Sequence, residues 1–434
     1  MAMVVKNNMS AISTLNTLNK NSSALSKSLA KVSSGMKING AADDASGYAI
    51  SERMRVQIRG LDQANSNTQN GNSMMKVAEG AVSSTVDILK TLKEKVINAA
   101  NDTNTDSDRA TIQKELDQSI DQINDNANVT FNGKYLVDGS HNSKVTATTT
   151  SMTNQSLFSD TDGSTAFSAM QDRNGNSLNI TSLDTVTISW VKEGKTYTSS
   201  VSATSNLSGL ISAANAVNSD FSTTIGTSEY IGVDIAGDTV NTADEKNALT
   251  ITASAANVDN QISGITISVT NTKGQVQKSA NAVLDNFTES IRAQNQSDDN
   301  AIVLQVGTKA NQSIKVGLTD MRAQALGLQG KDGSTLQIGT QEQANAAINV
   351  LDNAVSKALD QQTTIGSVQS RLSYTSTNLT TASENVQAAE STIRDADMAK
   401  EMTEYTKNNV LLQAAQSMLA QANQSSSSVL SLLQ

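Results

Sequence analysis

The pattern of hydrophobic positions is most regular at the two ends of the chain. At each end, apolar residues recur at steps of three and four, which predicts an amphipathic helix with one narrow apolar stripe. The N-terminal stripe consists of Val5, Met9, Ile12, Leu15, Leu18, Leu25, Leu29, Val32 and Met36. The C-terminal stripe consists of Met398, Met402, Tyr405, Leu412, Ala415, Leu419, Ala422, Val429 and Leu433. Because each stripe needs a partner, we expect the two terminal helices to pack side by side.

A pair of helices leaves more apolar edge than it can cover by itself. We therefore expect further copies of the chain to cover it, and we interpret the termini as a polymerisation surface. The alternative is a self-contained helix bundle, in which ordinary amphipathic helices cover their stripes within one chain. The residues assigned to polymerisation are Val5, Ile12, Leu15, Leu18, Leu25, Leu29, Val32, Leu412, Leu419, Val429 and Leu433.

Between the termini the helical period returns three times. A long helix is predicted over 58–96, and a shorter one follows the polar loop 101–108, where Asp106 or Ser107 can cap it. A third helical section covers 348–393, and the jump of five residues from Ile393 to Met398 predicts a break between inner and outer helices. Glycines interrupt the pattern near Asp43 and Asp44, so these acids are assigned to turns and helix capping.

From residue 141 to about 296 the period changes to the alternation that is typical of strands. A β-hairpin is predicted over 185–198, and the short helix LSGLISAANAV follows at Leu207. Further strands are expected at 231–235, 249–253 and 265–269. Outside this segment, FNGKYLVDGS at 131–140 is predicted to turn into a strand, and 301–318 is predicted to form a β-ribbon with its turn at 309–312.

These elements predict a mainly α fold. A long antiparallel coiled-coil-like bundle is formed by the N- and C-terminal segments, and it carries a β-ribbon and an inserted α+β or β surface domain. The predicted division is residues 1–45 with 397–434 for the terminal helices, 46–140 with 297–396 for the bundle and ribbon, and 141–296 for the insert.

Composition narrows the function classes. Only 3% of the residues are aromatic, which favours thin cores over a thick enzyme core, and the net charge of −10 argues against a nucleic-acid partner. With no cysteine, disulfides and thiolate metal sites are excluded. No window approaches the ~18 uninterrupted apolar residues of a membrane span, so no membrane insertion is expected. The start MAMVVKNNMS lacks the features of a cleaved signal peptide, so we expect export by another route.

Candidate chemistry is sparse. His141 is the single histidine, whereas HExxH zinc binding needs two at helical spacing, and no P-loop or dinucleotide motif is present. We therefore expect no catalytic, metal or cofactor site and regard His141 as an exposed loop residue. Strand-rich surface domains often bind glycans, but the lone Trp190 is expected in a core rather than as a sugar platform.

Several long stretches resemble bacterial flagellins. They are MAMVVKNNMSAIST, LAKVSSGMKINGAADDASGYAISERMRVQIRGLDQA, FNGKYLVDGS and IRDADMAKEMTEYTKNNVLLQAAQSMLAQANQSSSSVLSLLQ. The insert, through DTVTISWVKEGKTYT, GVDIA and NALTITASA, resembles the flagellin/hook IN motif. The resemblance implies an extracellular filament subunit that is exported unfolded through the flagellar type III channel. It also implies termini that are disordered in the monomer and fold on assembly. A hook–filament junction protein and a flagellin-like surface adhesin are the alternatives.

The resemblance implies further partners. Hook-associated and cap proteins would contact the filament, and a flagellar export chaperone would cover the C-terminal stripe, for which we assign Leu411, Leu412, Leu419, Val429, Leu430 and Leu433. These side chains are too apolar to leave free at high concentration.

The Toll-like flagellin receptor is expected to bind only weakly. Strongly stimulatory members of the family carry the helical pattern LQRVRELAVQ, whereas the matching stretch here is LKTLKEKVIN. Thr91 stands in place of the first arginine and Lys95 in place of the second leucine, while Glu115 keeps the matched acid. Threonine cannot donate the planar fork of hydrogen bonds that arginine supplies. The residues assigned to this region are Leu89, Lys90, Thr91, Lys93, Lys95 and Glu115.

Overall fold

The computed structural model describes residues 8–235 and 237–432, with side chains described as far as Ser425. The chain divides into two compact units. The first contains Met1–Thr68, Gln305–Gln312 and Tyr374–Gln434, and the second contains Gln69–Leu304 and Ser313–Ser373. The helices of the described chain are α1 (Met9–Ser34), α2 (Ala45–Ala99), α3 (Asp106–Ala127), α4 (Leu207–Val217), α5 (Lys278–Leu284), α6 (Gln341–Arg394) and α7 (Met398–Leu432).

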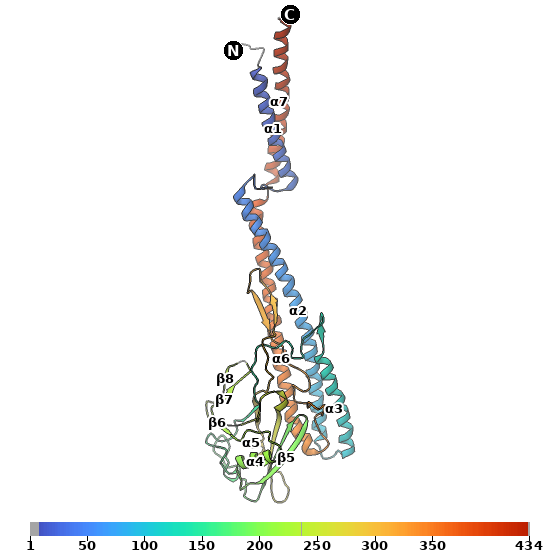
Figure 1. Ribbon diagram of the computed structural model, residues 1–434, viewed down its shortest axis with the longest axis vertical. Helices are drawn as coiled ribbons and strands as arrows, with labels where there is room; N and C mark the ends of the chain where they lie inside the picture. Colours follow the sequence, from blue (N-terminus) through green and yellow to red (C-terminus); the bar gives the residue numbers. More distant parts are fainter. Residues whose placement is uncertain (1–7, 236, 433–434) are drawn as a thin grey trace. The chain divides into compact units, whose positions relative to one another are not determined.

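In the first unit, α1 and α7 lie side by side and antiparallel (Figure 1). Asn21 Nδ2 donates to the Leu411 carbonyl over 3.2 Å, and Asn408 Nδ2 donates to Ser28 Oγ over 3.0 Å. The predicted pairing of the two termini is therefore confirmed for the described residues. The predicted break before Met398 is confirmed as well, because α6 ends at Arg394.

Helix α2 starts earlier than the predicted residue 58. Asp44 Oδ1 accepts a hydrogen bond from the Gly47 N–H over 3.0 Å and so caps the first turn, as expected for this acid. Gly47 has no side chain to disturb that cap, since a Cβ there would lie 2.6 Å from Asp44 Oδ2. The glycine that suggested an interruption is therefore part of the start of the helix.

In the first unit, the small core formed by Leu61, Ala64 and Leu379 joins the early turns of α2 to the late turns of α6. Ser383 Oγ and Asp62 Oδ1 are 3.0 Å apart, and Ser376 Oγ and Asn65 Oδ1 are 2.7 Å apart. This inner pair is thus held by a narrow apolar strip with hydrogen bonds along its edges.

The predicted β-ribbon is present as β12 (Ile302–Gln305) and β13 (Ser313–Val316), which pair with each other. Two glycines on α2 let the β-ribbon approach this helix closely. A Cβ at Gly60 would lie 3.0 Å from Thr308 Cγ2, and a Cβ at Gly71 would lie 2.7 Å from Leu304 Cδ1.

In the second unit, the later turns of α2, helix α3 and the early turns of α6 share a helical core. Its buried side chains include Met75, Val82, Leu89, Leu92, Val96, Leu116, Ile120, Ile123, Val350 and Leu351. Helix α3 is capped by Thr105, whose hydroxyl accepts from the Asp108 N–H while the Asp108 carboxylate accepts from the Thr105 N–H. The cap therefore lies one residue before the predicted Asp106, because this reciprocal box satisfies two backbone donors.

The insert is built on two sheets, and the predicted hairpin is confirmed. Its β4–β5 turn uses Glu193 and Gly194, both at positive φ (51° and 74°).

One sheet of the insert has the strand order β10-β4-β5 and the other has the order β11-β3-β9-β6. Strands β1 and β2 pair with each other, and so do β7 and β8. The strands are β1 (Thr130–Phe131), β2 (Lys134–Tyr135), β3 (Ser151–Asn154), β4 (Thr185–Lys192), β5 (Lys195–Ser202), β6 (Gly226–Ser228), β7 (Tyr230–Val233), β8 (Thr239–Asn241), β9 (Ala248–Thr252), β10 (Ile262–Thr270) and β11 (Phe287–Ile291).

Trp190 lies at the centre of the insert core, fully buried, as expected from the sequence. Its ring stacks on Tyr197 at 5.7 Å and meets Phe221 edge-on at 5.2 Å between centroids. The indole Nε1 donates to Asp220 over 2.9 Å, and Lys192 Nζ lies 2.8 Å from the other oxygen of that carboxylate. The indole N–H and the Asp220 carboxylate are therefore both paired, as buried polar groups in a stable core usually are.

Candidate assembly surface

The apolar stripe of α1 divides into two faces. Leu18, Leu25 and Val32 turn toward α7 and are half-buried. Met9, Ile12, Leu15 and Leu29 face away from it and are between 45% and 69% exposed. The sequence predicted one stripe, whereas the folded helix pair covers only part of it. The uncovered part consists of large apolar side chains of α1 that stay exposed beside and opposite the contact with α7.

Helix α7 has the same arrangement. Leu412, Ala415, Leu419 and Ala422 turn toward α1, whereas the outward side carries Met402, Val410, Leu411 and Met418 at 42% to 62% exposure. Sequence reasoning assigned Leu411 only to chaperone binding and missed Val410 and Met418. Met418 lies eight residues after Val410 and seven after Leu411, and this helical spacing is the signal that could have found them. The outward residues of both helices together are called the outer apolar face below.

The contact between the two helices is thin. Among the described side chains, Ser28 is the buried residue of α1 and Ala415 that of α7. A 3.7 Å ion pair between Lys31 and Glu401 and the asparagine hydrogen bonds add polar contacts to those of the half-buried apolar side chains. A single ion pair of this length and single hydrogen bonds each contribute about 1 kcal/mol. The pair therefore has little apolar stabilisation of its own.

Four of the predicted residues have no described side chain. Val5 and Leu433 lie outside the described ranges, and Val429 and Leu430 belong to α7 but their side chains are not described. Their assignment to polymerisation or chaperone binding remains a prediction.

The predicted receptor region lies on α2 and α3 in the second unit. Leu89 is fully buried in the helical core, so it is not available at the surface. Lys95 Nζ lies 3.0 Å from Glu115 Oε1, which means that the acid expected to meet a receptor is paired with a lysine of its own chain. Sequence reasoning named both residues but did not foresee that they bind each other.

The remaining residues of this region also have partners within the chain. Lys90 Nζ lies 3.3 Å from Asp87 Oδ1, and the Thr91 hydroxyl donates to the Asp87 carbonyl over 3.0 Å. Lys93 forms an ion pair with Asp352. Local pairs therefore satisfy the charged groups on this surface.

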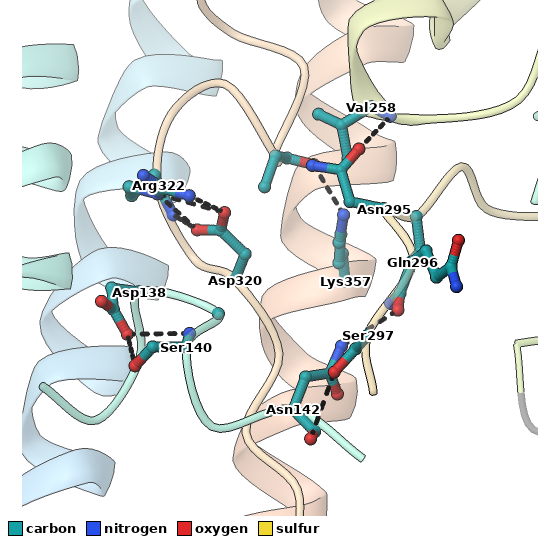
Figure 2. Close-up of a pocket in the computed structure, with 13 residues that line it drawn as sticks. Asp138, Ser140, Asn142, Val258, Asn295, Gln296, Ser297, Asp320, Arg322 and Lys357 are labelled. Carbon is teal, nitrogen blue, oxygen red and sulfur yellow. Dashed lines mark hydrogen bonds and ion pairs between the residues drawn. The ribbon is translucent and has the colours of Figure 1, made fainter. Parts of the chain in front are cut away.

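A polar cavity of about 340 Å³ lies elsewhere in the second unit (Figure 2). Its charged groups are engaged: Asp320 binds Arg322 through a two-pronged contact, and Lys357 Nζ donates to the Ala325 carbonyl over 2.6 Å. Burial lowers the pKa of Lys357. Ser140 Oγ donates to Asp138 Oδ1 over 2.6 Å, and the Ser140 N–H donates to the same oxygen over 3.0 Å, so this carboxylate holds the turn at the cavity edge (Figure 2).

We expected His141 to be an exposed loop residue, but it is half-buried. Its ring Nδ1 lies 3.1 Å from the Asn300 carbonyl. Within the described residues, no group of three or more His, Cys, Asp or Glu side chains is placed to hold a metal ion. Among the described helices, none combines the length and the apolar character needed to cross a membrane.

Comparison with known proteins identifies the family. The profile of the bacterial flagellin N-terminal helical region matches residues 5–142, and that of the bacterial flagellin C-terminal helical region matches residues 348–433. A flagellin of Clostridium tyrobutyricum is 34% identical, covering 97% of this chain and 99% of the relative. A flagellin of Bacillus subtilis (strain 168) is 31% identical, covering 99% of this chain and 100% of the relative.

A flagellar filament 33 kDa core protein of Treponema phagedenis is 29% identical over 99% of this chain and 100% of the relative. Both helical profiles and the full-length matches to flagellins favour a filament subunit over the junction-protein and adhesin alternatives. Trp190 is buried and is therefore not available as a sugar platform. The chain therefore belongs to the bacterial flagellin family and is a structural subunit of the flagellar filament.

Proposed function

We propose that the outer apolar face of α1 and α7 is the surface through which subunits polymerise. The observation that carries the proposal is the row of exposed large side chains on both terminal helices, such as Ile12, Leu15 and Met418. Exposed large apolar side chains gathered on two paired helices favour a protein partner, and a filament supplies identical neighbours. Val5, Val429 and Leu433 belong to the same proposed surface.

The inward residues have a second role in this proposal. Leu18, Leu25, Val32, Leu412 and Leu419 join α1 to α7 within one subunit, while the outward residues join neighbouring subunits. Because the inward contact is thin, the pair gains most of its stability only when neighbours cover its outer side. The terminal segments 1–45 and 397–434 are therefore mobile in the monomer and become ordered in the filament.

The test is a double substitution on the outer apolar face. Ile12→Ser with Leu15→Ser removes two exposed apolar side chains. If each side chain contributes on the order of 1 kcal/mol to the association of subunits, the critical concentration for polymerisation rises by at least about tenfold. Sedimentation of filaments measures the effect. The matched control is Leu183→Ser, which removes a side chain that is 74% exposed in the insert. Unchanged polymerisation of the Ile12/Leu15 variant would reject the proposal.

Three functional parts follow from this proposal. The terminal part is 1–45 with 397–434, the bundle and ribbon part is 46–140 with 297–396, and the insert is 141–296. Support comes from the element bounds, since α1 ends at Ser34, α7 begins at Met398 and β3 to β11 all lie within 141–296. The insert forms the exposed outer surface of the filament in this arrangement.

A flagellar export chaperone is the second proposed partner of the C-terminal helix. Leu411 is exposed, and Leu412 and Leu419 become available if the thin pair with α1 opens. Exposed apolar helix faces of this kind dock into grooves of helix-binding proteins. A chain lacking residues 397–434 should lose chaperone binding in a pull-down, and equal binding by the shortened and full-length chains would reject the assignment.

Recognition by the Toll-like flagellin receptor should be weak. The pairing of Lys95 with Glu115, the burial of Leu89 and the presence of Thr91 support this expectation. Thr91→Arg with Lys95→Leu supplies an arginine fork and releases Glu115, so reporter-cell signalling by the monomer should rise. The control is Lys90→Leu, which removes a lysine but leaves the Glu115 pair intact. Strong signalling by the unmodified monomer would contradict the expectation.

The protein is proposed to be non-catalytic and to act outside the cell. The paired charges of the cavity in Figure 2 support the absence of catalysis. Secretion is proposed to use the flagellar export channel without removal of a signal peptide, and hook-associated and cap proteins are the proposed neighbours at the filament ends. Intact-mass measurement of secreted subunits checks the N-terminus, because loss of a leader would lower the mass.

A further inference from the structure

Strand β10 lies at one edge of the sheet β10-β4-β5 in the insert. Strand β4 pairs with one side of β10, and within the described part of the chain no strand of that sheet pairs with its other side. Backbone groups of an antiparallel strand point alternately to its two sides, so Ile265, Ile267 and Val269 present their N–H and C=O groups on the same side. A row of unpaired groups at a sheet edge is a template for pairing with a strand of another chain.

Helix α6 binds two carbonyls in the first half of this edge. Asn349 Nδ2 donates to the Ile265 carbonyl over 3.1 Å, and Asn353 Nδ2 donates to the Ser263 carbonyl over 2.9 Å. The two asparagines are four residues apart, so they lie on one face of the helix. Their amides therefore occupy the place that the N–H groups of a neighbouring strand would take.

Helix α5 and its C-cap residue bind the second half of the edge. The Ile267 N–H donates to Asp285 Oδ1 over 3.1 Å, and the Val269 N–H donates to Asn281 Oδ1 over 2.7 Å. The Gln277 N–H, just before α5, donates to the Val269 carbonyl over 2.9 Å. Here side-chain oxygens take the place of strand carbonyls.

Together these side chains satisfy the edge without extending the sheet. We call the four of them the edge cap: Asn281, Asp285, Asn349 and Asn353. The residues that they bind, from Ser263 to Val269 on the outward side of β10, are at most 5% exposed. A neighbouring strand would offer a further row of backbone groups on its far side, whereas a side-chain amide or carboxyl ends the ladder.

A glycine lets α6 come close enough for this contact. Gly264 lies at an irregularity in the pairing of β10 with β4, between the two carbonyls that α6 binds. A Cβ at this position would lie 3.0 Å from the Val350 nitrogen on α6. The backbone of β10 therefore approaches the backbone of the helix directly, and no strand fits between them.

An open β10 edge would be a hazard in a filament. The subunits are identical, so every neighbour carries the same edge, and assembly raises the effective concentration at which two edges meet. Pairing of strands from many copies produces very stable aggregates. It would compete with ordered growth of the filament.

We propose that the edge cap blocks pairing of β10 with a strand from a second copy of this chain. Two members of the cap belong to α6, so the block also requires the insert to stay docked on that helix. The proposal does not depend on the outer apolar face, because it concerns the free subunit and a different part of the fold.

The first test is hydrogen exchange in the full-length monomer. The Ile267 and Val269 amides should be protected although they face no strand, to within about tenfold of the Thr266 and Ser268 amides, which point toward β4. Asn281→Ala should accelerate exchange of the Val269 amide by at least about tenfold and that of Ser268 by less than about twofold. An unprotected Val269 amide in the unmodified protein, or equal acceleration at both amides, would overturn the proposal.

The second test is association of unpolymerised subunits. Asn349→Ala with Asn353→Ala leaves two buried carbonyls without donors, so the docking of α6 on the edge weakens. Below the critical concentration for filament growth, this variant should form at least about tenfold more sedimentable, thioflavin T-positive material than the unmodified protein. The matched control is Asn345→Ala, an exposed position on the same helix, which should change association less than about twofold.

A core variant separates loss of the cap from general unfolding. Leu210→Val shortens a fully buried side chain of the insert without touching the edge cap. Thermal transitions followed by Trp190 fluorescence compare the stability of the variants, and association is measured well below both transitions. Equal association of the core variant and the asparagine variant would reject the proposal, and so would a folded asparagine variant that stays monomeric. If the double variant does not fold, Asn353→Ala alone is judged by the same outcomes.

Discussion

The insert and the terminal helix pair are stabilised in opposite ways within one chain. The insert encloses Trp190, Phe167, Leu210 and Ile267 completely or almost completely between its sheets and helices. In the described part of the terminal pair, the buried residues are small, Ser28 and Ala415, and the large side chains stay half-buried or exposed. The insert therefore completes its core within the subunit, whereas the terminal pair requires other subunits.

The difference follows from geometry rather than from hydrophobic content. Two sheets and two helices can surround a side chain on all sides, so each core residue gains the full transfer free energy, about 1.5–3 kcal/mol for a large apolar side chain. Two helices touch along a single line and leave the rest of each stripe in water. Apolar residues on α1 and α7 thus serve assembly, while those in the insert serve folding.

The largest effect is expected for Trp190→Ala, which tests whether the insert completes its core within the subunit. It removes the stacking on Tyr197 and the hydrogen bond to Asp220, and it opens a cavity, so we expect a loss of about 3–5 kcal/mol in the unfolding free energy of the insert. Thermal unfolding followed by circular dichroism measures the loss. The control Leu183→Ala, at an exposed site, should change stability by less than about 0.5 kcal/mol. A loss below about 1 kcal/mol for Trp190→Ala would contradict the self-contained core.

A second prediction uses pH to test one half-buried carboxyl of the insert, Asp285. Burial raises the pKa of Asp285 to about 7, although its carboxylate accepts a hydrogen bond from the Ile267 N–H over 3.1 Å. Because the folded pKa lies above the unfolded value of 3.8, this group contributes stability that is fully present below about pH 4 and is lost as pH rises through about 7.

Asp285→Asn removes the buried charge and keeps an oxygen acceptor for Ile267. We expect the variant to be more stable than the unmodified protein at pH 8 by roughly 2–4 kcal/mol, and to show little difference near pH 4. Unfolding transitions of both proteins at the two pH values provide the measurement. A variant that is less stable at pH 8, or whose stability changes equally at both pH values, would contradict this prediction. It would show that the ionised Asp285 carboxylate does not destabilise the folded protein.

The smallest expected effect concerns the inward face of the terminal pair. Leu25→Ala shortens a half-buried side chain between α1 and α7, and in the monomer we expect a loss of less than about 1 kcal/mol, because little core exists there to disturb. The same substitution should weaken filaments more strongly, since neighbours complete the packing. Helicity of the monomer and dissociation temperature of the filament measure the two effects. A loss above about 2 kcal/mol in the monomer would indicate a self-contained pair.

Local sequence determined much of the fold. The helix predicted from LSGLISAANAV is α4, Leu207–Val217, and the EGK turn forms the β4–β5 hairpin with Glu193 and Gly194 at positive φ. Both depend on residues within one or two turns of the chain, where capping, spacing and backbone preference act directly. The stripes of α1 and α7 were likewise evident from spacing alone, and the family motifs at both ends pointed to a filament subunit.

Only the tertiary structure decided which side of each stripe faces inward. Leu15 and Leu18 have the same spacing signal, but Leu15 is exposed and Leu18 turns toward α7, because the position of the partner helix selects the covered face. The pairing of Lys95 with Glu115 and the contacts of Arg394 with Glu52 and Met36 also join residues far apart in sequence. Periodicity fixes the direction of a side chain around its own helix axis, whereas its partner depends on how separate elements pack.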